Sequence, residues 1–170
     1  RAIPTDNQKY IDYVAFKKKF GDDGNLLVTG ITSKDLFTLK NFSAYQHLQT
    51  DLKKIKGVED ILSVPGAVNL VKDSAGEKLN AVKIFPDTII SQEQLDSAAA
   101  AFNNLPFYNN RLYNNNSKSY LMAVRINKDV LATKERSQVV GQINNALAKF
   151  ENDTKIETHV SGLPLIRTIV

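Results

Sequence analysis

The spacing of apolar residues along the chain follows two periods, one typical of helices and the other typical of strands. In four segments, apolar side chains recur every three or four positions, as they do on the buried face of a helix. Phe16 and Phe20 share such a face, Phe42 and Tyr45 share another, and Phe102 lies on a third. The pattern predicts helices over residues 5–20, 41–56, 91–103 and 133–152.

Short apolar runs bounded by turn residues lie between these segments and predict strands. The predicted strands cover residues 25–32, 58–64, 111–113, 120–126 and 156–161. Pro65-Gly66 breaks or bends the second of these, and residues 67–71 can continue it beyond the break. Residues 81–85 fit either a short strand or an extended linker. Asn114 to Ser117 has the composition of a turn, so the strands on either side of it should form a hairpin.

Residues suited to helix ends stand at the predicted boundaries. Asn41 or Ser43 can cap the second helix, and Thr133 can cap the fourth. Ser91, with Gln94 three residues later, matches a capping box at the start of the third helix. These side chains accept hydrogen bonds from main-chain N–H groups that have no partner within the helix.

The order of these elements predicts an α+β fold. Residues 25–71 form a βαβ unit, whose two strands should be parallel and joined by a right-handed crossover. Residues 91–162 make a second half of similar order, and residues 72–90 link the two. We therefore expect a ferredoxin-like split βαβ sandwich, in which a mixed sheet has its helices on one face. An extra helix and turn, residues 1–24, should precede it.

Composition and charge limit the classes of function. Of the 170 residues, 42% are hydrophobic and 24% are charged, as in a globular domain. The formal charge is +4, an excess too small to require a nucleic-acid partner. The absence of cysteine excludes disulfides, thiolate metal sites and cysteine nucleophiles. No run approaches the roughly 20 apolar residues that a membrane helix needs.

Residues that carry common active-site chemistry are sparse and isolated. His47 falls off the apolar stripe of the second helix, and His159 falls in the last strand, each without a Ser or Asp partner at a triad-like spacing. The adjacent acids Asp22-Asp23 and Glu59-Asp60 point their side chains apart. The strands lack the alternating basic and aromatic residues that stack bases. We therefore expect no catalytic residue, no metal, no cofactor and no nucleic acid.

The two ends of the sequence lead us to expect that the chain was cut from a larger protein. It begins with Arg1 rather than methionine. Its last residues become increasingly apolar and include Leu165, Ile166, Ile169 and Val170. A soluble domain that ended here would expose these side chains to water.

Four short stretches, in order along nearly the whole chain, resemble a known family. Phe20-Gly21 precedes a strand that begins Asn25-Leu26-Leu27-Val28, and Asp35-Leu36-Phe37-Thr38 precedes the second helix. Residues 56–64, KGVEDILSV, resemble the family's GV..V.S stretch at a helix end, and Ser161-Gly162-Leu163-Pro164 resembles its G.P before the membrane. The chain thus resembles the first extracytoplasmic loop of exporters of the resistance–nodulation–division (RND) superfamily, in the branch that includes MMPL- and Patched-like proteins.

The resemblance implies a location, partners and a role. The chain would be a soluble porter domain at the periplasmic face of the bacterial inner membrane, with residues 163–170 starting the helix that returns to the membrane. Its partners would be the membrane helices and the second periplasmic loop of the same transporter, which would also hold the energy-coupling residues. It would guide a hydrophobic or amphiphilic substrate, lipid-like or drug-like, outward, and would not be an enzyme.

Apolar and aromatic side chains in irregular segments are the candidates for the substrate path that this role implies. They are Phe85, Leu105, Phe107, Tyr108 and Tyr113. The competing interpretation is that these side chains fill the domain's own core, which is the commoner position of large apolar residues.

Two other functions also fit the sequence. One is a freestanding secreted or periplasmic interaction module of similar fold, and the other is a small enzyme with a polar pocket around His47 or His159. If a second loop normally supplies a strand or helix, the isolated chain should expose an unpaired strand edge or an apolar patch. Two copies could then self-associate through it.

Overall fold

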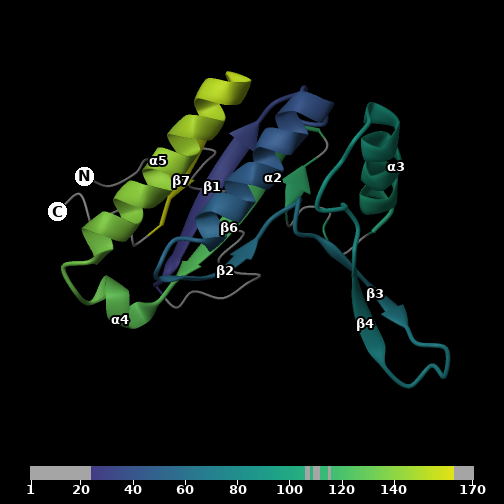
Figure 1. The fold of residues 1–170 in the computed structure, drawn as a ribbon, viewed down its shortest axis with the longest axis horizontal. Helices are drawn as coiled ribbons and strands as arrows, with labels where there is room; N and C mark the ends of the chain where they lie inside the picture. Colours follow the sequence, from purple (N-terminus) through teal and green to yellow (C-terminus); the bar gives the residue numbers. More distant parts are fainter. Residues whose placement is uncertain (1–23, 106–107, 109–111, 115, 163–170) are drawn as a thin grey trace.

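The computed structural model describes residues 24–105, 108, 112–114 and 116–162. Within them it shows an α+β fold, in which two helices cover one face of a sheet and a hairpin extends away from both (Figure 1). The helix predicted over residues 5–20 and the helix start predicted at 163–170 lie outside the described residues.

A five-stranded sheet forms the centre of the fold. Four strands follow in the spatial order β2 (Val58–Leu62), β6 (Ser119–Ile126), β1 (Leu26–Thr32), β7 (Thr158–Ser161), and the short β5 (Tyr113–Asn114) also pairs with β6. Every described pair of neighbouring strands is antiparallel, so the prediction of a mixed sheet was wrong. β1 and β2 do run in the same direction, but β6 lies between them and pairs with both.

β6 can lie between β1 and β2 because most of its side chains are apolar, including Leu121 and Ala123 on the face opposite Tyr120. Its predicted alternation is confirmed, since Tyr120, Met122 and Val124 are buried on one face. Ala123 on the opposite face is buried as well. β1 shows the same burial on both sides. The two central strands therefore have the low polarity of strands whose faces are both covered.

Helices α2 (Leu39–Lys53) and α5 (Arg136–Thr154) pack on the same face of the sheet (Figure 1). Thr38, rather than the predicted Asn41 or Ser43, caps α2, and its hydroxyl accepts a hydrogen bond from the Asn41 N–H at 3.3 Å. The prediction failed because the helix begins two residues earlier than its apolar stripe suggested. None of the helices within the described ranges combines the length and the apolar content that crossing a bilayer requires.

The start of the fourth predicted helix also differs from the prediction. Asn127 caps a separate short helix, α4 (Lys128–Leu131), before α5 begins. Thr133 lies in the turn between the two helices, where its hydroxyl accepts a hydrogen bond from the Glu135 N–H at 3.2 Å. α5 itself begins without a side-chain cap.

Residues 72–90 do more than link the two halves. β3 (Val68–Lys72) and β4 (Leu79–Lys83) form an antiparallel hairpin that projects from the body of the domain (Figure 1). Residues 67–71 therefore do not continue β2, because β3 belongs to a sheet of its own. Of the two interpretations of residues 81–85, the strand is therefore the better one, although it begins earlier and ends at Lys83. The exposed, mixed composition of β4 hid it, because nothing in the described residues packs on either face.

Helix α3 (Gln92–Asn103) follows the hairpin and is capped as predicted. The Ser91 hydroxyl accepts a hydrogen bond from the Gln94 N–H at 3.1 Å. The Gln94 side chain reaches back to the Ile90 N–H at 2.9 Å, one residue before the position of an ordinary capping box.

Candidate functional site

Three of the five predicted substrate-path residues meet in one place. Phe85, Tyr108 and Tyr113 are each at most 5% exposed. Leu105 is half-buried and packs against the same core, while Phe107 lies outside the described residues. A substrate could therefore reach these rings only if the surrounding elements moved.

Phe102 of α3 is the ring around which the others gather. Its centroid lies 5.8 Å from that of Phe85, 5.3 Å from Tyr108 and 5.0 Å from Tyr113. Tyr113 in turn stacks on Tyr120 of β6 at 6.4 Å. Rings at these separations attract one another beyond the effect of their buried area. These five residues are called the aromatic cluster below.

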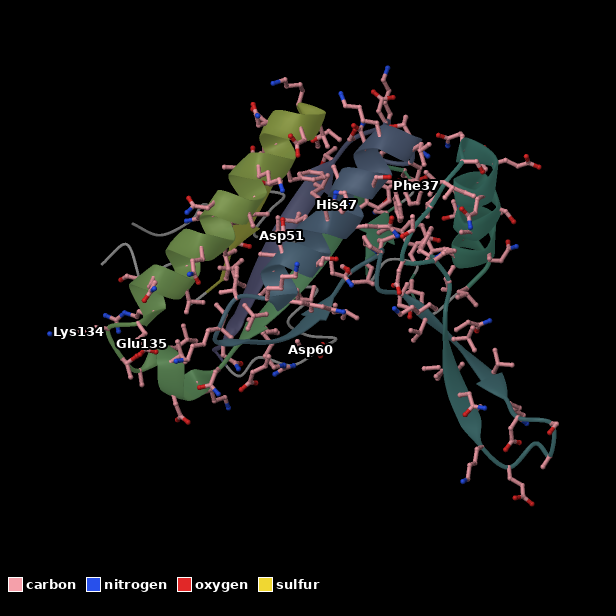
Figure 2. The ribbon with its side chains drawn as sticks, in the orientation of Figure 1. Phe37, His47, Asp51, Asp60, Lys134 and Glu135 are labelled. Atoms are coloured by element: carbon pink, nitrogen blue, oxygen red, sulfur yellow. The ribbon has the colours of Figure 1, made fainter. Side chains whose placement is uncertain are left out.

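Sequence reasoning missed part of this arrangement. Phe85 also lies 4.7 Å from Phe42 and 6.3 Å from Phe37, measured between ring centroids. Figure 2 shows Phe37 on the side of α2 that faces α3. Helical spacing did identify Phe42 and Phe102 as core positions. It carried no signal that they meet Phe85, because their elements are far apart in the sequence.

Gln92, in the first turn of α3, joins this helix to the start of α2. Its side-chain carbonyl accepts a hydrogen bond from the Leu39 N–H at 2.8 Å, and its amide donates to the Phe37 carbonyl at 2.9 Å. Leu95 and Phe102 of α3 are fully buried. Two hydrogen bonds and an apolar face therefore hold α3 against the aromatic cluster.

The Tyr108 hydroxyl joins the aromatic cluster to the hairpin. It accepts a hydrogen bond from the Val68 N–H at 2.9 Å and donates one to the Val68 carbonyl at 2.8 Å. Val68 is the first residue of β3. A single side chain therefore satisfies both main-chain groups at the base of the hairpin.

Replacing Tyr108 by phenylalanine should lower the free energy of unfolding by about 1–2 kcal/mol, because both Val68 groups lose their partner. Hydrogen exchange at the Val68 amide should also become faster. Chemical denaturation and exchange measure the two effects. Tyr45→Phe is the matched control, because the buried Tyr45 hydroxyl has no hydrogen-bond partner among the described residues and its loss should not destabilise the domain. Equal destabilisation by both variants would contradict this assignment.

Burial raises the pKa of Tyr45, Tyr113 and Tyr120. The neighbouring Tyr120 raises the pKa of Tyr45 by a smaller amount, and Tyr113 does the same for Tyr120. Desolvation acts in this direction because it disfavours the charged phenolate. These hydroxyls therefore stay neutral over the physiological range and do not supply a base.

The stability of the domain should fall as the pH rises above about 10, the ordinary pKa of tyrosine in an unfolded chain. In that range the unfolded state releases protons that the buried tyrosines of the folded state keep. The stabilising contribution is complete below this pH and is lost as the pH climbs toward the raised folded-state values. Urea unfolding over this range measures the decline, and Tyr45→Phe should make it shallower. An unchanged slope in that variant would refute the expectation.

The two histidines lie on different elements, His47 on α2 and His159 on β7. His47 is exposed on α2 (Figure 2), beside a shallow hollow between α2 and α5 where Lys149 Nζ lies 3.7 Å from Asp51 Oδ2. His159 Nε2 lies 4.0 Å from the carboxylate of the exposed Glu157. Within the part of the chain that the structure describes, no three His, Cys, Asp or Glu residues are grouped so that they could hold a metal ion.

Comparisons of the chain with protein-family models, with curated proteins and with solved structures find no match. What the domain does must therefore be inferred from its strand order, its aromatic cluster and its exposed surfaces.

Proposed function

We propose that this chain is a periplasmic porter domain of an RND-type exporter. It guides a hydrophobic or amphiphilic substrate outward while the membrane helices of the same transporter use the proton gradient. The observation that carries the proposal is the strand order β2-β6-β1-β7. The resemblance of the sequence to this family implies a porter domain built on a ferredoxin-like sheet, and this strand order fits one.

The strand order arises from two interleaved βαβ units. β1, α2 and β2 form the first unit, and β6, α5 and β7 form the second. β6 of the second unit lies between β1 and β2 of the first unit. β1 of the first unit lies between β6 and β7 of the second unit. Because α2 and α5 lie on one face (Figure 1), the proposal includes a ferredoxin-like split βαβ fold.

Two glycines within the resembling stretches lie where a side chain is excluded. Gly57, just before β2, has a φ of +101°, and a Cβ atom there would lie 3.2 Å from Val139 Cγ2. Gly162, just after β7, has a φ of +129°, and a Cβ atom would lie 2.5 Å from the Leu26 carbonyl oxygen. Both positions have a structural need for glycine. They therefore support the fold within the proposal and not the transport role.

The aromatic cluster is the place where we propose that the substrate passes. It combines large apolar rings with the hydroxyls of Tyr113 and Tyr120, a mixture suited to amphiphilic molecules. The rings are covered in this conformation, so passage requires α3 to move away from the sheet. Such a movement would break the two hydrogen bonds of Gln92 to the start of α2.

The parent reading frame gives the first test of this proposal. Apolar spans of about 20 residues on both sides of the chain would support a loop between membrane helices. A cleavable signal before Arg1, together with a stop codon near Val170, would overturn the exporter proposal.

Leu105→Gln in the full-length transporter tests the substrate path. Leu105 is half-buried beside the aromatic cluster, and a polar amide there should slow the export of the lipophilic dye N-phenyl-1-naphthylamine from cells by about tenfold. Ile90→Gln is the matched control, because Ile90 is 79% exposed just before α3. Equal export rates for the two variants, at equal levels of folded transporter, would refute a path beside the cluster.

A freestanding secreted or periplasmic interaction module is the second candidate function. The observation that favours it is the group of exposed apolar side chains on the β3–β4 hairpin. The same reading frame distinguishes it from the exporter domain.

A further inference from the structure

The β3–β4 hairpin exposes apolar side chains on both of its faces. Leu70 and Leu79 are each 61% exposed on one face, and Val71 and Val82 are exposed on the other. The hairpin projects away from the sheet and the helices (Figure 1). A two-stranded hairpin without a covered face is at most marginally stable in water. We therefore expect the hairpin to be stabilised by a partner that covers it.

The hydrogen bonds within the hairpin show which main-chain groups point outward. Ile84 N–H donates to the Ala67 carbonyl at 3.2 Å, and Asp73 N–H donates to the Lys78 carbonyl at 2.9 Å. Every second residue between these pairs also faces the partner strand. The N–H and C=O groups that point outward belong to Val68, Leu70 and Lys72 on β3 and to Leu79, Ala81 and Lys83 on β4.

The two outer edges of the hairpin are not equivalent. On β3, the Tyr108 hydroxyl occupies both outward groups of Val68, which shortens the edge available to another strand. On β4, no described residue hydrogen-bonds to the outward groups of Ala81 at the middle of the strand. The β4 edge is therefore the longer open edge, and open edges pair readily with another strand.

We propose that the occupant of this edge is a second copy of the chain, which pairs its own β4 antiparallel to the first about a two-fold axis at Ala81. Ala81 then pairs with Ala81 of the second copy, and Leu79 pairs with Lys83 of the second copy. The two hairpins become one four-stranded sheet. A two-fold axis makes the same edge serve both copies, as in most homodimers.

Charge complementarity favours a second copy over an unrelated strand. In this register, the turn that carries Glu77, two residues before β4 begins, lies next to Lys83 of the other copy, and the axis repeats the pair. No lysine lies directly opposite another lysine. Lys83 already donates a hydrogen bond to Asp87 at 2.6 Å, and both side chains are exposed. The three N–H donors of its ammonium group allow it to bind Glu77 as well.

The side chains on the same face are also self-complementary. Leu70 lies opposite Ala81 within each hairpin. In the paired sheet, the central row therefore reads Leu70, Ala81, then Ala81 and Leu70 of the second copy. Every member of this row is apolar, so one continuous apolar row replaces two isolated patches.

Two proline substitutions test the pairing in the full chain. Ala81→Pro removes an outward N–H of β4 and leaves the bonds to β3 in place, as proline is tolerated on edge strands. Leu70→Pro makes the same change on the other edge. Sedimentation should show a concentration-dependent dimer for the unmodified chain. Ala81→Pro should weaken it by at least about tenfold. Leu70→Pro should weaken it clearly less, because it removes one side chain of the apolar row and leaves the β4 edge intact.

A charge exchange provides a second, independent measurement that does not depend on proline. Glu77→Lys and Lys83→Glu should each weaken the dimer, and the double variant should restore it, because the attraction is between copies. Restoration by the double variant would support this register.

Three results would overturn the proposal. They are a monomer at hundreds of micromolar, a dimer that Leu70→Pro and not Ala81→Pro disrupts, and a dimer that neither proline affects. The proposal would also be refuted if the isolated chain were monomeric and its β4 paired with another segment of a parent transporter. None of these outcomes bears on substrate export, so the proposed function is tested separately.

Discussion

Replacing Phe102 by alanine should lower the free energy of unfolding by about 3–5 kcal/mol, the largest loss that we expect from any single substitution. Phe102 is fully buried, and its ring contacts those of Phe85, Tyr108 and Tyr113. Alanine would leave a cavity between α3 and the sheet, and three rings would lose a neighbour. Chemical denaturation of the full chain measures the loss.

Ile90→Ala is the control for this experiment. Ile90 is a large apolar residue just before α3, but it is exposed, so its truncation should change stability by less than about 0.5 kcal/mol. A small loss for Phe102→Ala as well would mean that the aromatic cluster is loosely packed. That result would contradict a close-packed core and would favour a cluster that opens easily to a substrate.

Replacing Gly162 by alanine should lower the free energy of unfolding by about 2–4 kcal/mol. Its φ of +129° is a backbone conformation that residues with a side chain rarely adopt. The added Cβ atom would lie 2.5 Å from the Leu26 carbonyl oxygen and 3.3 Å from Leu27 Cα, both of which are backbone atoms of β1. Because the central strand cannot move aside easily, β7 should separate from β1. Hydrogen exchange at the β1–β7 pairs should then become faster.

Gly141→Ala is the matched control for Gly162→Ala. Gly141 lies in the interior of α5, and a Cβ atom there would meet nothing within 4 Å beyond the neighbouring backbone of its own helix. Alanine should therefore stabilise the helix by about 0.5–1 kcal/mol, because it has the higher helix propensity. If both substitutions changed stability in the same direction, the close approach of Gly162 to β1 would be refuted.

Only part of the aromatic cluster could be predicted from the sequence. The residues Phe85, Tyr108 and Tyr113 could be picked from the sequence, because they are large apolar side chains in segments without a clear period. Their common neighbour Phe102 was recognised only as one residue on a helical stripe. Ring contacts depend on how α3 lies against the sheet, and no local pattern contains that information.

The conformation of β4 could not be predicted from its local sequence pattern alone. β4 is exposed along its whole length and mixes apolar with polar residues, so its sequence fits a strand or a linker equally well. Its conformation is decided by pairing with β3. The open edge of β4 follows from the same hydrogen-bond pattern, and could not be assigned before the pairs were known.

By itself, the sequence determined the type of most elements and the α+β class, because helical and strand periods are local properties of the chain. It did not determine that β6 lies between β1 and β2, that all described neighbouring strands are antiparallel, or that an aromatic cluster forms beneath α3. Tertiary packing decided these features. They depend on which apolar faces, far apart in the sequence, cover one another most completely.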